Sequence, residues 1–339
     1  MRAYSSTVKS LLDYVRGVRH PEAFHGRGIS HDFFEGWYIK LVSADASQRW
    51  AVIPGIFHGT KGGDQPAESV AFVQVLDGQT GRSWFHEFPV DSFKASTIKF
   101  DVSVGQNHFD ETGVTLDLPN IKGRLEFTSE LDGWPVTLLS PGIMGWYGLV
   151  PFMECFHGIV SFGHGLAGNL EIDNQKVSFA GGRAYIEKDW GSSFPSGYFW
   201  LQSNHFAEDP TASIVASAAI IPWLGSAFRG FIVGLKHGGH LYEWTTYGKS
   251  KELDLDITDN HVSWKLTGKD GGLEIIAERK TGGLLHAPLK TAMFKRVEET
   301  MLTEVSVKHL DKNGNVVFES IGDAASMEVF GDLEKLLKL

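Results

Sequence analysis

The sequence contains a single cysteine, Cys155, and no long apolar run. One cysteine cannot form an internal disulfide, which is typical of a reducing compartment. Residues 1–20 lack the continuous apolar segment of a signal peptide, and no later stretch approaches the roughly 20 apolar residues of a membrane-spanning helix. These absences predict a cytoplasmic protein.

Positive charge is also scarce, since 31 Lys and Arg stand against 41 Asp and Glu, a formal net charge of −10. The basic residues form no stripe that could follow a phosphate backbone, so we expect no nucleic-acid partner. No GxGxxG follows a strand, and the strings GxxxxGK[ST], HExxH, CxxC and GxSxG do not occur. These gaps argue against nucleotide-binding, zinc-protease and serine-hydrolase chemistry.

The 14 histidines are scattered. The pairs His157 with His164 and His237 with His240 could approach one another, but they lack the carboxylate or thiol neighbours of a metal site. We therefore expect neither a metal nor a cofactor.

Glycine and aromatic residues are abundant, with 39 Gly, 23 Phe and 10 Trp. From Phe34 onward, short runs with period-two alternation are separated by turn signals such as Asp77-Gly78 and Asn313-Gly314, which predicts an all-β, antiparallel protein. The expected strands are 71–76, 84–90, 97–104, 198–206, 213–221, 230–235, 241–247, 261–266, 273–278, 301–310 and 316–321.

The segment 140–168 is apolar and glycine-rich without clear periodicity, so we interpret it as a buried crossover between two β halves. Two strand sets of similar size predict two antiparallel β-barrel or sandwich halves, because closure removes exposed edges. We place the domains at 1–160 and 161–339. Apolar residues at helical spacing from Val8 to Val18 predict a short N-terminal amphipathic helix, which would serve as a packed terminus, a lid or a membrane contact.

Three stretches place ionisable groups among large aromatic residues: 31–38, 146–158 and 185–195. Burial raises the pKa of a carboxyl group, and a buried carboxylic acid can act as a general acid. The alternative is that Glu35, Glu154 and Asp189 accept hydrogen bonds that hold the sheets together. Glu187 and Asp189 should share one face of a strand, with Lys188 pointing away.

Long aromatic-rich strings in these regions resemble the tocopherol cyclase family. The strings occur in family order: FFEGWYIKL (33–41), SPGIMGWYGLVPFMECFHGIVS (140–161), GGRAYIEKDWGSSFP (181–195), FWLQSNHF (199–206) and ASMEVFGD (325–332). The resemblance extends from about residue 20 almost to the C-terminus, and more distantly to lipocalin-like carotenoid hydratases and pericyclases. It implies a lipocalin-like fold and an enzyme that closes the chromanol ring of a prenylated quinol without a redox cofactor.

For this reaction we select Asp189 as the proton donor, with Glu35 and Glu154 as supporting carboxylates. Aromatic faces would stabilise the carbocation by cation–π attraction, about 1–2 kcal/mol each. The expected substrate-binding residues are Trp37, Tyr38, Trp146, Tyr147, His157, Glu187, Trp190, Trp200, Gln202 and Asn204.

Two other function classes stay open. A non-catalytic carrier of a prenylquinone or another hydrophobic molecule would need the pocket but not the acid, and a purely structural β module would need neither. Both the enzyme and the carrier would bind a hydrophobic small molecule. Such molecules reside in membranes, so peripheral membrane contact is compatible with the prediction. The oligomeric state is not indicated by the sequence.

Overall fold

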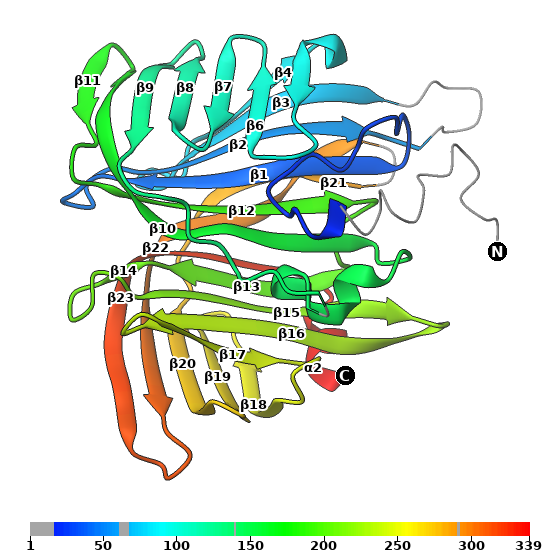
Figure 1. Ribbon diagram of the computed structural model, residues 1–339, viewed down its shortest axis with the longest axis vertical. Coiled ribbons are helices and arrows are strands. Elements are labelled where there is room, and N and C mark those ends of the chain that lie inside the picture. Colours follow the sequence, from blue (N-terminus) through cyan, green and yellow to red (C-terminus); the bar gives the residue numbers. More distant parts are fainter. Residues whose placement is uncertain (1–16, 61–67, 139, 290–291) are drawn as a thin grey trace.

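The computed structural model describes residues 17–60, 68–138, 140–289 and 292–339, and it consists of two large antiparallel sheets with few helices (Figure 1). This confirms the all-β prediction. The expected helix at 8–18 lies almost entirely outside the described residues. Within the described part of the chain, no helix combines the length and apolar character needed to cross a bilayer.

The first sheet has the order β4-β3-β2-β1-β12-β10-β9-β8-β7-β6-β5, with β11 beside β10. Consecutive strands are mostly neighbours, as in a meander. The strands are β1 (Phe33–Val42), β2 (Arg49–His58), β3 (Ser69–Asp77), β4 (Ser83–Phe88), β5 (Phe93–Ala95), β6 (Asp101–Val104), β7 (Asn107–Asp110), β8 (Gly113–Asp117), β9 (Ile121–Phe127), β10 (Cys155–Ile172), β11 (Gln175–Ser178) and β12 (Arg183–Gly191). The 3-10 helices are η1 (Val90–Ser92) and η2 (Gly142–Leu149).

The second sheet has the order β17-β16-β15-β13-β23-β22-β20-β19-β18, with β14 beside β23 and β21 beside β22. A short helix, α2 (Leu333–Lys338), follows its last strand. The strands are β13 (Gly197–Ser203), β14 (His205–Phe206), β15 (Ser213–Trp223), β16 (Ser226–His237), β17 (His240–Thr245), β18 (Lys251–Ile257), β19 (His261–Gly268), β20 (Gly271–Glu278), β21 (Gly283–Pro288), β22 (Met293–Leu310) and β23 (Val316–Gly331).

Each sheet curls around its own core. In the first sheet, side chains from β1–β3 pack against side chains from β6–β10, and in the second sheet β13–β16 pack against β19–β23. The two halves are therefore sandwich-like. In each sheet the first and the last strand of the order do not pair with each other, so no closed barrel of hydrogen-bonded strands is found among the described residues.

The glycine-rich segment that the sequence suggested as a crossover is in large part the long strand β10, and this expectation was wrong. β10 is buried without a break over residues 158–162 and its register shifts between Ile159 and His164, so the period-two pattern of a half-exposed strand is interrupted there. The chain passes from the first sheet to the second between Gly191 and Gly197, whereas the boundary expected at 160 falls inside β10.

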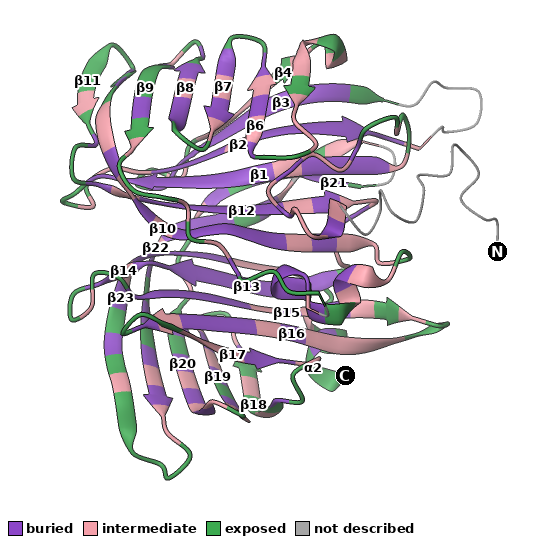
Figure 2. Cartoon of the chain, in the orientation of Figure 1, coloured by how far each residue is buried: buried purple, intermediate pink, exposed green. Residues whose placement is uncertain are grey.

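The two sheets meet along a third apolar cluster. It joins Tyr38, Leu76 and Tyr185 of the first sheet with Tyr198 and other residues of the second sheet. Figure 2 shows that the central strands of both sheets are buried over most of their length. This contact positions the site described next, because the site is built from both sheets.

Candidate active site

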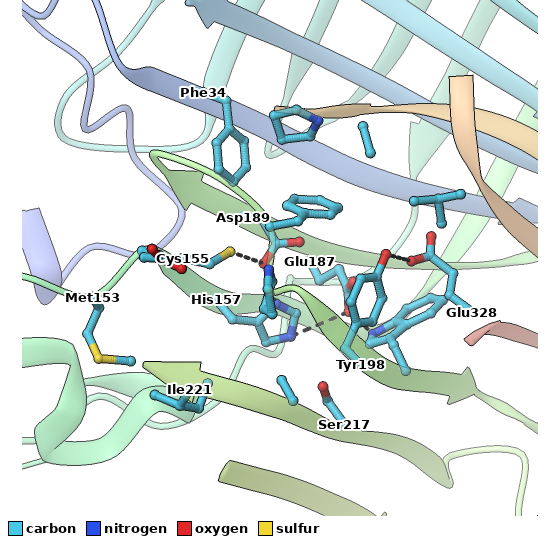
Figure 3. Close-up of a pocket in the computed structure, with 18 of the residues that line it drawn as sticks. Phe34, Met153, Cys155, His157, Glu187, Asp189, Tyr198, Ser217, Ile221 and Glu328 are labelled. Atoms are coloured by element: carbon cyan, nitrogen blue, oxygen red, sulfur yellow. Dashed lines mark hydrogen bonds and ion pairs between the residues drawn. The ribbon is translucent and has the colours of Figure 1, made fainter. Parts of the chain in front are cut away.

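A cavity of about 210 Å³ lies between the two sheets and is lined mainly by apolar side chains (Figure 3). The first sheet contributes residues from β1, β2, β3, β10 and β12. The second contributes residues from β13, β15, β16 and β21–β23, and η2 and its flanking residues complete the wall. A largely apolar pocket with a few converging polar groups is typical of a small-molecule site.

The main polar group of the pocket comes from β10 and β12. Glu187 and Asp189 are two residues apart on β12, so their side chains lie on the same face of the sheet. His157 on β10 is the register partner of Asp189. His157 Nδ1 lies 2.8 Å from Asp189 Oδ1, and its Nε2 lies 3.7 Å from Glu187 Oε2. The imidazole therefore connects the two carboxyl groups.

Glu187 accepts hydrogen bonds on one oxygen. Tyr185 Oη donates to Oε2 at 2.5 Å and Trp200 Nε1 donates to the same atom at 3.1 Å. Within the described part of the chain, Oε1 accepts no hydrogen bond, and the residue lines the pocket. One carboxyl oxygen is thus held in place while the other is available to a ligand.

For both Glu187 and His157, burial and the neighbouring charges shift the pKa in opposite directions. Burial raises the pKa of Glu187 to about 7, although His157 opposes the shift. For His157, burial lowers the pKa, but the charges of Asp189 and Glu187 outweigh it and raise the pKa to about 9. At neutral pH these shifts favour a protonated His157 and keep part of Glu187 protonated.

The second sheet supplies another carboxyl group. Glu328 lines the pocket and accepts a hydrogen bond from Tyr198 Oη at 2.6 Å. Its register partner on β22 is Glu299, which is fully buried and accepts a hydrogen bond from Tyr38 Oη. Burial raises the pKa of both Glu299 and Glu328 to about 8, and mutual or nearby carboxylate charge adds to the shift.

Glu35, which the sequence suggested as a supporting carboxylate, faces away from the pocket. It forms a buried ion pair with Lys188 and accepts hydrogen bonds from the backbone N–H groups of His25 and Gly26 at 2.9 and 3.0 Å. Because β1 and β12 alternate faces, Glu35 and Lys188 occupy the side opposite Glu187 and Asp189. Lys188 thus points away from the site, as predicted.

The remaining predicted residues divide by strand face. Trp37 is buried in the core of the first sheet, and Trp190 stacks on His25 with ring centroids 4.1 Å apart. Neither lines the pocket, nor do Trp146, Gln202 and Asn204, the last two being fully buried and bonded to protein atoms. The predicted residues that line it are Tyr38, Tyr147, Glu154, His157, Glu187, Asp189 and Trp200.

Tyr185, Tyr198, Glu299 and Glu328 were missed as site residues. The string ASMEVFGD contains Glu328, so the sequence carried a signal for it. The partners Tyr198 and Glu299 lie 130 and 29 residues away along the chain, and only the strand order brings them beside Glu328.

His157, Glu187 and Asp189 offer ligand atoms within 4.8 Å of one another, close enough for a metal ion. However, Asp189 occupies His157 Nδ1, and Tyr185 and Trp200 occupy Glu187 Oε2. This hydrogen bonding suits a protonated imidazole between two carboxyl groups better than a set of metal ligands.

Three large apolar side chains that are neighbours in sequence of pocket-lining residues are exposed. Trp146 is 43% exposed, Phe152 is 53% exposed and Leu224 is 83% exposed. Each is close in sequence to a lining residue, namely Tyr147, Met153 or Pro222. The rings of Trp146 and Phe152 also contact Trp223, with centroids 6.4 and 5.3 Å away, and we refer to Trp146, Phe152 and Leu224 as the apolar rim.

Two plant proteins resemble the chain over most of its length. It is 22% identical to a probable chloroplastic tocopherol cyclase of Oryza sativa subsp. japonica, covering 93% of this chain and 79% of the plant protein. It is 24% identical to the chloroplastic tocopherol cyclase of Zea mays, covering 93% of this chain and 78% of that protein.

Solved structures share the fold. Kievitone hydratase from Nectria haematococca matches with a TM-score of 0.50 at 12% identity, over 94% of this chain and 93% of the hydratase. CghA with Sch210972 matches with a TM-score of 0.51 at 11% identity, over 88% of this chain and 89% of CghA. The family model described as tocopherol cyclase-like matches residues 127–331, which include β10, β12, β13 and β23 and with them the polar groups of the pocket. The chain belongs to the tocopherol cyclase-like family.

Proposed function

We propose that this protein is an enzyme that closes a chromanol ring by protonating an alkene of a prenylated quinol. The observation that carries the proposal is the His157 imidazole placed between Asp189 and Glu187 in an apolar pocket. Ring closure consumes one proton at carbon and releases one from oxygen. In this trio Glu187 gives the proton to carbon, Asp189 takes the proton from oxygen, and His157 lies between the two carboxyl groups.

Glu187 is the proton donor in this mechanism. Its pKa of about 7, raised by burial, keeps a large fraction protonated at neutral pH, and Oε1 is directed to the ligand because Oε2 is held by Tyr185 and Trp200. The sequence analysis favoured Asp189, but Asp189 is bonded to a protonated His157 and therefore suits the role of base.

The reaction balances without a redox partner. The Glu187 O–H bond breaks as a C–H bond forms at the less substituted alkene carbon, which leaves a tertiary cation. The quinol oxygen attacks this cation and forms the new C–O bond, and its proton passes to Asp189. The faces of Trp200 and Tyr38, whose ring centroids are 5.3 Å apart, line the pocket and stabilise positive charge there.

His157 restores the starting state. Its Nε2–H moves to the Glu187 carboxylate, which leaves a neutral imidazole that keeps its Nδ1–H toward Asp189. After the product leaves, Nε2 takes a proton from solvent and Asp189 releases the proton that it accepted from the quinol. The 3.7 Å separation between Nε2 and Oε2 is longer than a hydrogen bond, and such contacts often tighten when ligand binds. The apolar walls exclude water that would otherwise capture the cation.

The test is anaerobic incubation of the purified protein with a phytylated or geranylgeranylated benzoquinol in D₂O. We expect an isomeric chromanol that carries one carbon-bound deuterium, detected by mass spectrometry. Glu187→Gln should abolish this product, whereas Ser217→Ala, which removes a hydroxyl of the pocket wall that forms no hydrogen bond with the trio among the described residues, serves as the matched control.

Other products would point to other functions. A product heavier by one water would indicate a hydratase. An unchanged quinol that co-purifies with the protein, equally in the wild type and in Glu187→Gln, would overturn the cyclase in favour of a carrier.

A further inference from the structure

The segment 146–152, which contains the end of η2 and leads toward β10, is a thin part of the pocket wall. Tyr147 lines the pocket, whereas Trp146 and Phe152 are exposed. The rings of Trp146 and Tyr147 stack with centroids 4.0 Å apart. At this point the wall is therefore two stacked rings thick, with one ring facing the pocket and the other facing solvent.

Gly145 separates this segment from an anchored turn. Its backbone has a φ of +57° and a ψ of −144°, which interrupts the helix and is a conformation that favours glycine. On the other side of Gly145, Ile143 is 1% exposed and packs in the third apolar cluster. Tyr247 Oη donates a hydrogen bond to the carbonyl oxygen of Ile143 at 2.9 Å. The segment 146–152 can therefore pivot at Gly145 while the turn before it stays fixed.

Aromatic rings join the segment to the β15–β16 hairpin of the second sheet. Its three rings each pack against Trp223 of the hairpin, with centroids 5.3 to 6.4 Å apart, and they are Trp146, Tyr147 and Phe152. Tyr147 also stacks on Phe228, with centroids 5.9 Å apart. Figure 1 shows this part of the chain, in green, beside β15 and β16. Because the segment belongs to neither sheet, this seam of rings can part without breaking a strand pair.

The pocket extends to both sides of this seam. Tyr147 and Met153 line it on the side of the segment, and Pro222 and Phe228 line it on the side of the hairpin. A seam with pocket-lining residues on both sides opens the pocket to solvent when it parts. We propose that residues 146–152 form a lid, and that an apolar small molecule enters and leaves the pocket between this lid and the β15–β16 hairpin.

The seam consists of aromatic side chains, which determines the class of molecule that passes. An elongated hydrocarbon, such as an isoprenoid chain, can slide between the rings without removing water from a charged group. The closed lid then excludes water from the apolar pocket. An enzyme and a carrier would both need such an entrance, so this inference does not rest on the proposed reaction.

The test locks the lid from outside the pocket. Phe152 and Trp223 do not line the pocket, and their ring centroids are 5.3 Å apart. In a Cys155→Ser background, Phe152→Cys and Trp223→Cys are joined by a short bifunctional thiosulfonate that dithiothreitol removes. Binding of retinol, an isoprenoid alcohol, is followed in a stopped-flow instrument by its fluorescence, which rises in an apolar site.

We expect retinol to associate with the linked protein at least roughly tenfold more slowly than with the unlinked double variant, because the lid cannot open. Retinol that is bound before linking should be released more slowly by a similar factor. Dithiothreitol should restore both rates. The retention of bound retinol distinguishes a closed lid from a linker that fills the pocket.

Two further variants separate the lid from general effects of cross-linking. The same linker between Lys265→Cys and Glu274→Cys, which are register partners on β19 and β20, should leave both rates unchanged. Trp223→Ala removes the ring that all three lid rings contact, and it should speed association and release at least about threefold. Thermal melting checks that each variant is folded, and Trp223→Ala tests the lid if the double cysteine variant does not fold.

Three results would overturn the inference. One is association and release at the unlinked rates in protein whose cross-link is complete by mass spectrometry. Another is unchanged rates in Trp223→Ala. The third is a wild-type protein that takes up no retinol, because a lid over this pocket has to admit such a molecule.

Discussion

At the scale of single residues, the ion pair between Glu35 and Lys188 is the clearest case of a charge that depends on its partner. Both side chains are fully buried. Glu35→Gln should destabilise the protein by about 3–5 kcal/mol, because it leaves the Lys188 ammonium buried without a carboxylate. The free energy of unfolding in urea measures this loss. The exposed pair Lys265–Glu274 provides the control, and Glu274→Gln should change stability little.

The pH dependence of the reaction follows from Glu187. Its pKa, raised by burial to about 7, means that the protonated donor disappears above that pH, so kcat/KM should fall about tenfold per pH unit there. A pH–rate profile on the quinol tests this, and a rate that rises through pH 7 would contradict it. The folded pKa also exceeds the usual value of 4.5, so the stability that Glu187 contributes at acidic pH is lost as the pH rises through about 7.

The sequence predicted part of the site for a physical reason. Alternation along a strand places Glu187 and Asp189 together and Lys188 opposite, and this requires no knowledge of the partner strands. Glu35 was misassigned because an acidic residue among aromatics does not reveal which face its strand buries. Glu328 was missed because its neighbours Tyr198 and Glu299 come from other strands.

At the scale of elements, β10 shows where periodicity fails as a guide. Its middle, residues 158–162, is covered on both faces and so has no exposed face to alternate with, and glycines such as Gly158 and Gly163 remove further side chains from the pattern. The GxGxxG string at 163–168 lies inside this strand and not between a strand and a helix. The neighbouring strands β19 and β20, in which buried residues alternate with more exposed ones, followed the expected alternation more closely.

Gly191 sets the approach of β10 to β12 at the site. A Cβ there would lie 2.2 Å from the carbonyl oxygen of Glu154, and the backbone φ is +152°. Gly191→Ala should cost about 2 kcal/mol or more and weaken turnover, because the strands must separate where His157 meets Asp189. Urea unfolding and the chromanol assay measure both effects. Gly225→Ala, with a φ of +88° but open space around the Cβ, should cost only about 1 kcal/mol and spare activity.

At the scale of the whole molecule, the exposed rim predicts contact with a lipid surface. Trp146, Phe152 and Leu224 are exposed and lie within two residues of residues that line the pocket, and aromatic and aliphatic side chains of this kind insert at the membrane interface. We expect the protein to co-sediment with vesicles of zwitterionic lipid, with little effect of salt because the chain is acidic, with a net charge of −10.

The combined change Phe152→Glu and Leu224→Glu should release the protein from the vesicles. Leu253→Glu is the control, since Leu253 is 65% exposed on β18 and does not line the pocket. Equal sedimentation of both variants would rule out the rim as the contact surface.

The origin of the pocket from two separately packed sheets has a consequence for how the enzyme could be adapted. In the proposed reaction, protons are transferred by residues of β10 and β12, whereas much of the apolar wall of the pocket belongs to β15 and β16. A library at Ile221, Phe228 and Ile232 should therefore alter which chain lengths are accepted while the pH midpoint set by Glu187 stays unchanged. If the proposed reaction holds, we expect chain-length selection and acid strength to be adjustable independently of each other in this scaffold.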